Sequence, residues 1–107
     1  MKSKAIINKT LVEHHIFPNK KGYKYLFGVM EYVLENGCRV LYGAYESVAA
    51  YYGIKVNSVE KCIASAIETS FDNIYIAEKY GSFTSARSGK ITNKRFIKLL
   101  IEEIHNA

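Results

Sequence analysis

Apolar residues recur three and four positions apart along almost the whole chain, which is the spacing of helices rather than of strands. Glycine, proline and asparagine clusters mark where each predicted helix ends. The predicted helices cover about residues 4–15, 22–36, 45–52, 57–70 and 72–79, with a last one that begins at Thr92 or Asn93. The pattern therefore predicts an all-α fold, a compact six-helix domain that spans residues 1–107.

Each predicted helix carries an apolar stripe, and we expect these stripes to meet in one core. The expected inward residues are Ile6, Ile7, Leu11 and Val12; Tyr25, Leu26, Val29, Met30 and Val33; Val59, Cys62, Ile63, Ala66 and Ile67; Ile74 with Ile76 or Ala77; and Phe96, Ile97, Leu100, Ile101 and Ile104. Residues 38–44 are apolar without a clear period, and they fit an extended connection or a short helical turn. A polar loop, residues 81–90, precedes the last helix.

The segment from about residue 45 to residue 71 has the form of a helix-turn-helix. A short helix stops at Gly53, and a longer helix is entered through Asn57 and Ser58. The second helix of this motif usually lies in a DNA major groove. Asn57 and Ser58 are expected to cap that helix and to offer polar groups to a phosphate or a base edge.

The distribution of charge along the sequence argues against DNA binding by this motif. The chain carries a net charge of +5. Residues 1–24 hold six lysines and one glutamate, residues 79–107 hold six basic and two acidic groups, and the middle, residues 25–78, holds three basic and seven acidic groups. The helix-turn-helix thus lies in the acidic part of the sequence, although uneven surface charge is also common in proteins that bind no nucleic acid.

Other classes of protein have little support in the sequence. No apolar run is long enough for a signal peptide or a membrane helix, so we expect a cytoplasmic protein without membrane contact. Cys38 and Cys62 form no CxxC motif and are expected to be reduced thiols. His14 and His15 are adjacent and would point about 100° apart on a helix, so no metal site and no cofactor are expected. The chain has no P-loop and no GxGxxG motif, and an enzyme is the weakest hypothesis.

Three segments resemble a known family in their order and spacing. They are residues 21–26 (KGYKYL), residues 59–68 with Val-Glu-Lys, Ile63 and Ala-Ile-Glu, and residues 90–97 with KITN followed by Phe96 and Ile97. The chain resembles the C-terminal DNA-binding effector domain of the stage-zero sporulation response regulator of spore-forming Firmicutes. The resemblance implies a six-helix domain around a helix-turn-helix that activates or represses genes at the onset of sporulation. The family protein also has a receiver domain, which we expect to be missing here, together with its phosphorylation-controlled dimerisation.

The recognition helix departs from the family pattern. By the resemblance, Ser58 and Ala64 stand where the family has arginine, Ser65 stands where it has histidine, and Lys61 replaces another arginine, whereas Glu60 is kept. Arginine presents a planar fork to guanine, whereas lysine is a point charge and serine a short hydroxyl. The helix must therefore read a different sequence or must have lost base readout.

The DNA hypothesis assigns contacts to nine residues around the helix-turn-helix and the last loop. They are Lys55, Asn57, Ser58, Glu60, Lys61, Ser65, Arg87, Lys90 and Lys94. The lysines at residues 20–24, with Arg95 and Lys98, are further candidates for phosphate contacts. The expected partner is double-stranded DNA, and a homodimer is plausible because the family domain dimerises on DNA.

The alternative is a protein-interaction module. The Ala- and Ser-rich outer face of the second motif helix would then pack on a partner, with the tyrosines at positions 42, 45, 51 and 52 as amphipathic anchors. The partner under this hypothesis is a related regulator or RNA polymerase.

Overall fold

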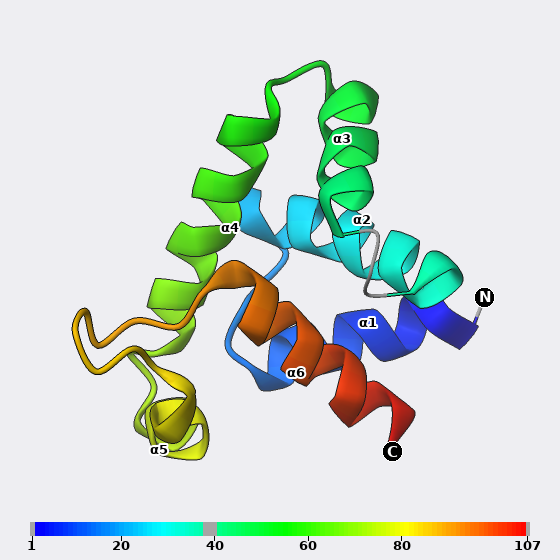
Figure 1. Cartoon of the computed structure of the whole chain (residues 1–107). Coiled ribbons are helices and arrows are strands. Elements are labelled where there is room, and N and C mark those ends of the chain that lie inside the picture. The colour runs from blue at the N-terminus through cyan, green and yellow to red at the C-terminus, as the bar shows by residue number, and fades with distance from the viewer. Residues whose placement is uncertain (1, 38–40, 107) are drawn as a thin grey trace.

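The computed structural model describes residues 2–37 and 41–106, and within them every regular element is a helix (Figure 1). The elements are α1 (Lys2–Glu13), α2 (Lys21–Asn36), α3 (Leu41–Tyr52), α4 (Val56–Ser70), α5 (Ile74–Tyr80), the 3-10 turn η2 (Gly81–Phe83) and α6 (Asn93–His105). The predicted all-α class is confirmed. No helix in these ranges combines the length and the apolar character that a membrane span requires.

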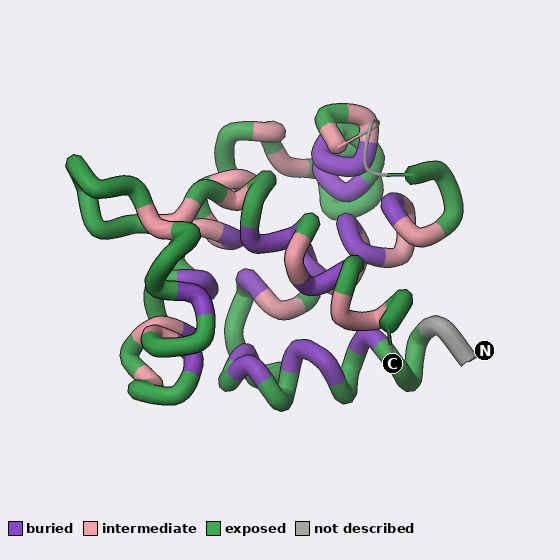
Figure 2. The backbone as a smooth tube through the Cα atoms, turned by 60° about the horizontal axis from the view of Figure 1, so that its bottom comes forward, coloured by how far each residue is buried: buried purple, intermediate pink, exposed green. Residues whose placement is uncertain are grey.

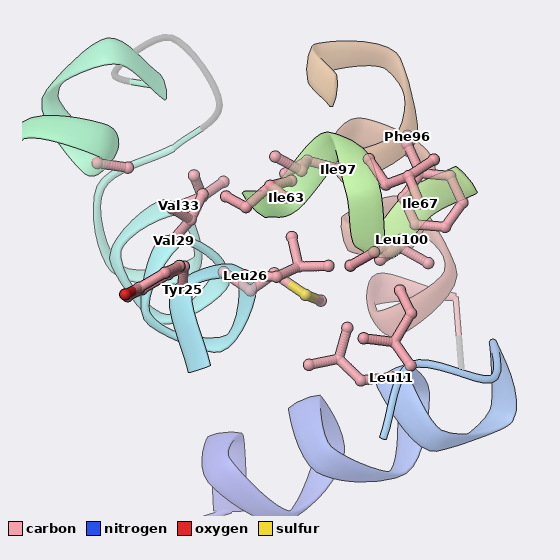
Figure 3. Close-up of a cluster of buried hydrophobic side chains, with 14 of the residues drawn as sticks. Leu11, Tyr25, Leu26, Val29, Val33, Ile63, Ile67, Phe96, Ile97 and Leu100 are labelled. Carbon is pink, nitrogen blue, oxygen red and sulfur yellow. The ribbon is translucent and has the colours of Figure 1, made fainter. Parts of the chain in front are cut away.

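Helix α2 occupies the centre of the fold. It packs against α1, α3, α4 and α6, and α4 also packs against α3 and α6. Side chains from four of these helices meet in the core that Figure 3 shows, with Leu26 of α2 in the middle, Leu11 of α1 on one side, and Ile63 of α4 and Leu100 of α6 on the others. Figure 2 shows that the buried positions follow one side of each helix, as amphipathic helices require.

Most of the expected core is confirmed, but three of its members are wrong. Ile6 and Val12 are 39% and 38% exposed, and Ile74 is 65% exposed. In α1 the buried face instead runs through Ile7, Leu11 and residue 14, a spacing of four and three that leaves positions 6 and 12 at its margins. Cys62 and Ile104 are only half-buried, and Ala77 is half-buried while Ile76 faces the core.

Several helix starts also differ from the prediction, those of α3 and α5 among them. α3 begins at Leu41 instead of Tyr45, so residues 41–44 are helical, while Cys38 and the rest of 38–40 lie outside the described residues. α5 begins at Ile74 instead of Asp72, because the Asn73 side chain accepts hydrogen bonds from the N–H groups of Tyr75 and Ile76 and caps the helix there.

The turn of the helix-turn-helix has the predicted form. Gly53 has φ +66°, a left-handed conformation that glycine adopts without steric cost. The N–H of Ile54 then donates to the carbonyl of Ala49 at 2.9 Å, which closes the end of α3. The chain enters α4 three residues after the turn, and Figure 1 shows α4 along one edge of the molecule.

Candidate nucleic-acid interface

The outer face of α4 is formed by residues that the sequence analysis selected. Asn57, Ser58, Lys61 and Ser65 are exposed, and Lys55 is exposed just before the helix. At about 100° per residue, Lys61 lies at the centre of this face and the other three within about 60° of it. The opposite side carries Val59, Ile63, Ala66 and Ile67, all buried. The helix therefore presents one polar strip outward and a fully packed strip inward.

The first turn of α4 differs from the expectation. Asn57 and Ser58 do not cap the helix, because the helix begins one residue earlier, at Val56. Lys55 takes the capping position with extended backbone, and its carbonyl accepts from the N–H groups of Ser58 and Val59 at 3.0 and 3.2 Å. No side chain of the described residues caps this end. The side chains of Asn57 and Ser58 are thus exposed in the first turn, where a helix can offer N–H groups and a positive dipole to an anion.

One flank of α4 lies against the start of α2. A Cβ at Gly22 would stand 2.5 Å from the Cβ of Ala66 and 2.6 Å from the carbonyl oxygen of Cys62, so only glycine allows the two helices to approach this closely. Lys20 and Lys21 immediately precede Gly22 and are exposed. The basic N-terminal part of the sequence is therefore brought beside the middle of α4.

The other flank of α4 lies against the start of α6. The side-chain amide of Asn93 donates to the carbonyl of Glu60 at 3.0 Å. Thr92 caps α6 by accepting from the N–H of Arg95 at 3.2 Å, as expected of a helix that begins at this position. Glu60 is half-buried on this flank, about 100° away from Lys61. Glu60 therefore lies at the border of the outer face, and Lys94 is exposed in the adjoining first turn of α6.

The loop before α6 reaches the last turns of α4, as Figure 1 shows. Lys90 forms an ion pair with Glu68 at 3.1 Å, and both side chains are mostly exposed. The loop is closed by hydrogen bonds from Ser85 N–H to the carbonyl of Lys90 and from Gly89 N–H to the carbonyl of Ser85, each 2.8 Å. Arg87 is exposed at its tip. The loop thus places Lys90 next to α4 and leaves Arg87 exposed to solvent.

The fold brings basic residues from both ends of the sequence to the flanks of α4. The acidic middle of the sequence folds so that α4 lies between Lys20 and Lys21 on one flank and the loop with Arg87 and Lys90 on the other. Lys90 also offsets the charge of Glu68 in the last turns of α4. Lys90 is the basic residue that contacts α4 directly, and Lys20 and Lys21 adjoin the glycine that packs against it.

Sequence reasoning did not identify the two residues that position α4, Gly22 and Asn93. Gly22 was noted only as a helix start and within a family-like segment, and its signal would have been a glycine in the first turn of an otherwise apolar helix face. Asn93 follows a helix-capping threonine, where no pattern marks a contact with another helix. Tyr45 was expected as a surface anchor and is wrong in that role, since it is 6% exposed, whereas Tyr42 and Tyr51 are 63% and 82% exposed.

A polar cluster around the buried His14 joins α1, α5 and α6, and the hydroxyl of Ser70 at the end of α4 donates to the His14 carbonyl. His14 is 2% exposed; its Nδ1–H donates to the carbonyl of Thr10 at 2.7 Å, and its Nε2 lies 2.7 Å from the hydroxyl of Tyr80 and 3.2 Å from Glu103. Burial lowers the pKa of His14. Burial alone would raise the pKa of Glu103, but the hydrogen bond from Lys79 at 2.7 Å and the nearby histidine lower it on balance. Within residues 2–37 and 41–106, no three His, Cys, Asp or Glu side chains are grouped to hold a metal ion.

Comparison with known proteins gives one match. Residues 6–104 match the family described as sporulation initiation factor Spo0A C terminal. No curated protein and no solved structure matches the chain at a significant level.

Proposed function

The chain belongs to the Spo0A C-terminal family, and from that premise we propose that it is a sequence-specific DNA-binding regulator of transcription whose α4 enters the major groove. The family is one of DNA-binding regulatory domains and not of enzymes. The observation that supports the proposal most strongly is the position of α4, which presents a polar strip between two basic flanks.

The outer face of α4 can distinguish bases even though it carries few charged side chains. An asparagine such as Asn57 can bond adenine through both N6 and N7, and Lys61 can donate to the acceptors of guanine. Ser58 and Ser65 can donate to or accept from either kind of base edge. Because these residues differ from the arginines of the family, we expect this domain to select a different target sequence.

The flanking cations supply contacts to the DNA backbone in this proposal. Lys55 at the start of α4, Arg87 and Lys90 in the loop, and Lys94 in α6 are all exposed. Phosphate contacts of this kind set register and affinity without reading sequence, and they release counterions. Binding should therefore weaken steeply as salt concentration rises.

Two further partners belong to the proposal. A homodimer on DNA follows the behaviour implied by the family, and it would show as two chains per site in a stoichiometric titration. Contact with RNA polymerase or with a related regulator would let bound protein change transcription. Membrane contact and a cofactor have no part in it.

The test is a titration of labelled duplex DNA at low and at physiological salt. Duplexes with a randomised core, selected for binding, would serve as the specific probe, and an unselected duplex of the same length as the non-specific one. We expect Lys61→Ala to weaken binding to the selected duplex by roughly tenfold and to leave the unselected duplex less affected. We expect Lys90→Ala/Lys94→Ala to weaken both duplexes and to reduce the salt dependence by about two ions.

Lys9→Ala is the matched control, because Lys9 is exposed on α1, away from α4 in Figure 1. It should bind both duplexes like the natural protein. Absence of binding even at low salt would overturn the proposal and favour the interaction module. If Lys61→Ala leaves the affinity unchanged while Lys90→Ala/Lys94→Ala lowers it, the protein contacts the DNA backbone without base readout by α4.

A further inference from the structure

A groove between α2 and α3 lies apart from the α4 face. It has a volume of about 510 Å³, and its lining comes from α2 and α3 with Lys4 of α1 at its edge. Phe27 and Val48 form apolar parts of its wall, and Gly28 lies close against α3, since a Cβ there would stand 2.9 Å from Val48 Cγ2. The lining includes no residue of α4, α5, α6 or the loop between them.

The groove is acidic in a chain that is basic as a whole. Glu31 and Glu35 line it from α2, with one lysine in the lining, Lys4, and Lys24 near the ring of Tyr52 at one end. None of the ion pairs among the described residues involves either glutamate. The two positions are four residues apart, which places their carboxylates on the same side of α2, about one turn from each other. A DNA backbone would be repelled here, whereas a cationic partner would be attracted.

Exposed aromatic rings form the other wall. Tyr51 is 82% exposed, and its ring lies 4.9 Å from that of Tyr52 in an edge-to-face arrangement. The ammonium group of Lys24 lies 4.8 Å from the centre of the Tyr52 ring, so this wall already contacts one cation from within the chain. A ring as exposed as Tyr51 beside two carboxylates is well suited to stack on an arginine.

We propose that the α2–α3 groove binds a basic amphipathic helix of another protein. Arginine or lysine side chains one turn apart on the partner would pair with Glu31 and Glu35. An apolar residue between them would enter toward Phe27, and a further cation would stack on Tyr51. Helix-in-groove recognition uses anchors with this spacing. The lining of the groove includes no residue of α4, although Tyr52 lies only three residues before Lys55.

The probe is a synthetic helical peptide with arginine at every fourth position and leucine between, compared with the same peptide carrying glutamate for arginine. Amide shifts of the ¹⁵N-labelled protein would locate binding. We expect saturable shifts confined to α2 and α3 with the arginine peptide only. Glu31→Gln/Glu35→Gln should weaken the peptide at least tenfold and Tyr51→Ala severalfold, while Glu78→Gln, at an exposed position on α5, should stay within twofold of the natural protein.

Several outcomes would overturn the inference. They are shifts that the glutamate peptide reproduces, shifts that fall on other helices, or affinity that survives the double glutamine change. Sedimentation of the free protein adds a separate arm: self-association that Glu31→Gln/Glu35→Gln abolishes would make a second copy the occupant instead of another protein. All measurements are made without DNA, so their failure leaves the proposed DNA binding untouched.

Discussion

The two flanks of α4 are held by opposite kinds of contact. On the α2 side, Gly22 lets backbone meet backbone, and the contact with Cys62 and Ala66 has no room for a methyl group. On the α6 side, the contacts are polar and near solvent: Asn93 to the carbonyl of Glu60, and Lys90 to Glu68. The first flank fixes where α4 lies in the fold. The second determines which charges stand beside its outer face, and so it can change without loss of the fold.

The largest effect should come from filling the tight flank. Gly22→Ala places a Cβ 2.6 Å from the carbonyl oxygen of Cys62, a backbone atom that cannot rotate away. We expect the free energy of unfolding to fall by about 1–3 kcal/mol, since overpacking forces helices apart. Chemical denaturation followed by circular dichroism measures this loss.

Gly81→Ala is the control for Gly22→Ala. Gly81 has helical backbone angles, and a Cβ there meets no atom of the described residues within 4 Å. Alanine should leave stability unchanged or raise it by about 0.4–1 kcal/mol through the unfolded chain. Alanine favours the helix over glycine at both positions, so helix propensity predicts a gain and not a loss. An equal loss in Gly81→Ala would therefore mean that the loss in Gly22→Ala does not come from the α2–α4 contact.

The contacts of His14 combine features of the two flanks of α4. They are polar, like those on the α6 side, but His14 and Tyr80 are buried, as on the α2 side. Burial lowers the pKa of His14, so the unfolded chain takes up a proton near pH 6.5 before the folded protein does. This contribution to stability is complete above about pH 6.5 and is lost as pH falls from there toward the folded pKa. The lowered pKa of Glu103 adds a further loss in the acid range, as pH falls through its folded value.

His14→Gln should cost about 1–2 kcal/mol at neutral pH, since it disturbs buried hydrogen bonds to Thr10 and Tyr80. It should also remove the loss of stability that begins near pH 6.5, which denaturation at a series of pH values would show. His105→Gln, at an exposed position, should keep the natural profile. A profile that His14→Gln leaves unchanged would assign the pH dependence to other groups.

The sequence predicts the faces of single helices better than the contacts between helices. Helical spacing located the core of α4 and α6, because burial of one face imposes a period on the residues that form it. The phase of α1 was misjudged, since a satisfied histidine at position 14 belongs to the buried face and Ile6 does not. Periodicity is a property of one helix, whereas the contacts of Gly22 and Asn93 depend on how two helices cross. For that reason the residues on α4 were predictable and the elements beside them were not.

A smaller effect should follow from Asn93→Ala. It removes the hydrogen bond to the Glu60 carbonyl at a half-buried position, and we expect a loss of about 1 kcal/mol in unfolding free energy. The start of α6 and the loop before it should then be less firmly held to α4. DNA affinity should therefore fall more than for Asn106→Ala, an exposed control at the end of α6. Loss of stability with unchanged DNA affinity would separate this contact from the binding surface.

The smallest effect on stability should come from the Lys90–Glu68 ion pair. Both side chains are more than half exposed, so Glu68→Gln and Lys90→Ala should each change stability by less than about 0.5 kcal/mol. Their effects on DNA binding should have opposite signs. Glu68→Gln removes a negative charge beside the outer face of α4 and releases Lys90 for a phosphate, so we expect affinity to rise severalfold at low salt. Lys90→Ala should lower it and reduce the salt dependence by about one ion.

The double variant decides whether the pair acts at the DNA surface. If Glu68 acts mainly by holding Lys90, Glu68→Gln should gain little affinity once Lys90 is alanine, and a double-mutant cycle on the dissociation constants would show the coupling. If the two effects simply add, Glu68 repels DNA on its own, and the C-terminal half of α4 still faces the duplex. If neither variant changes affinity, the loop lies outside the interface and α4 approaches DNA through its first turns alone. Each result places the edge of the interface at a different point along one helix, while the tight flank at Gly22 keeps that helix in place.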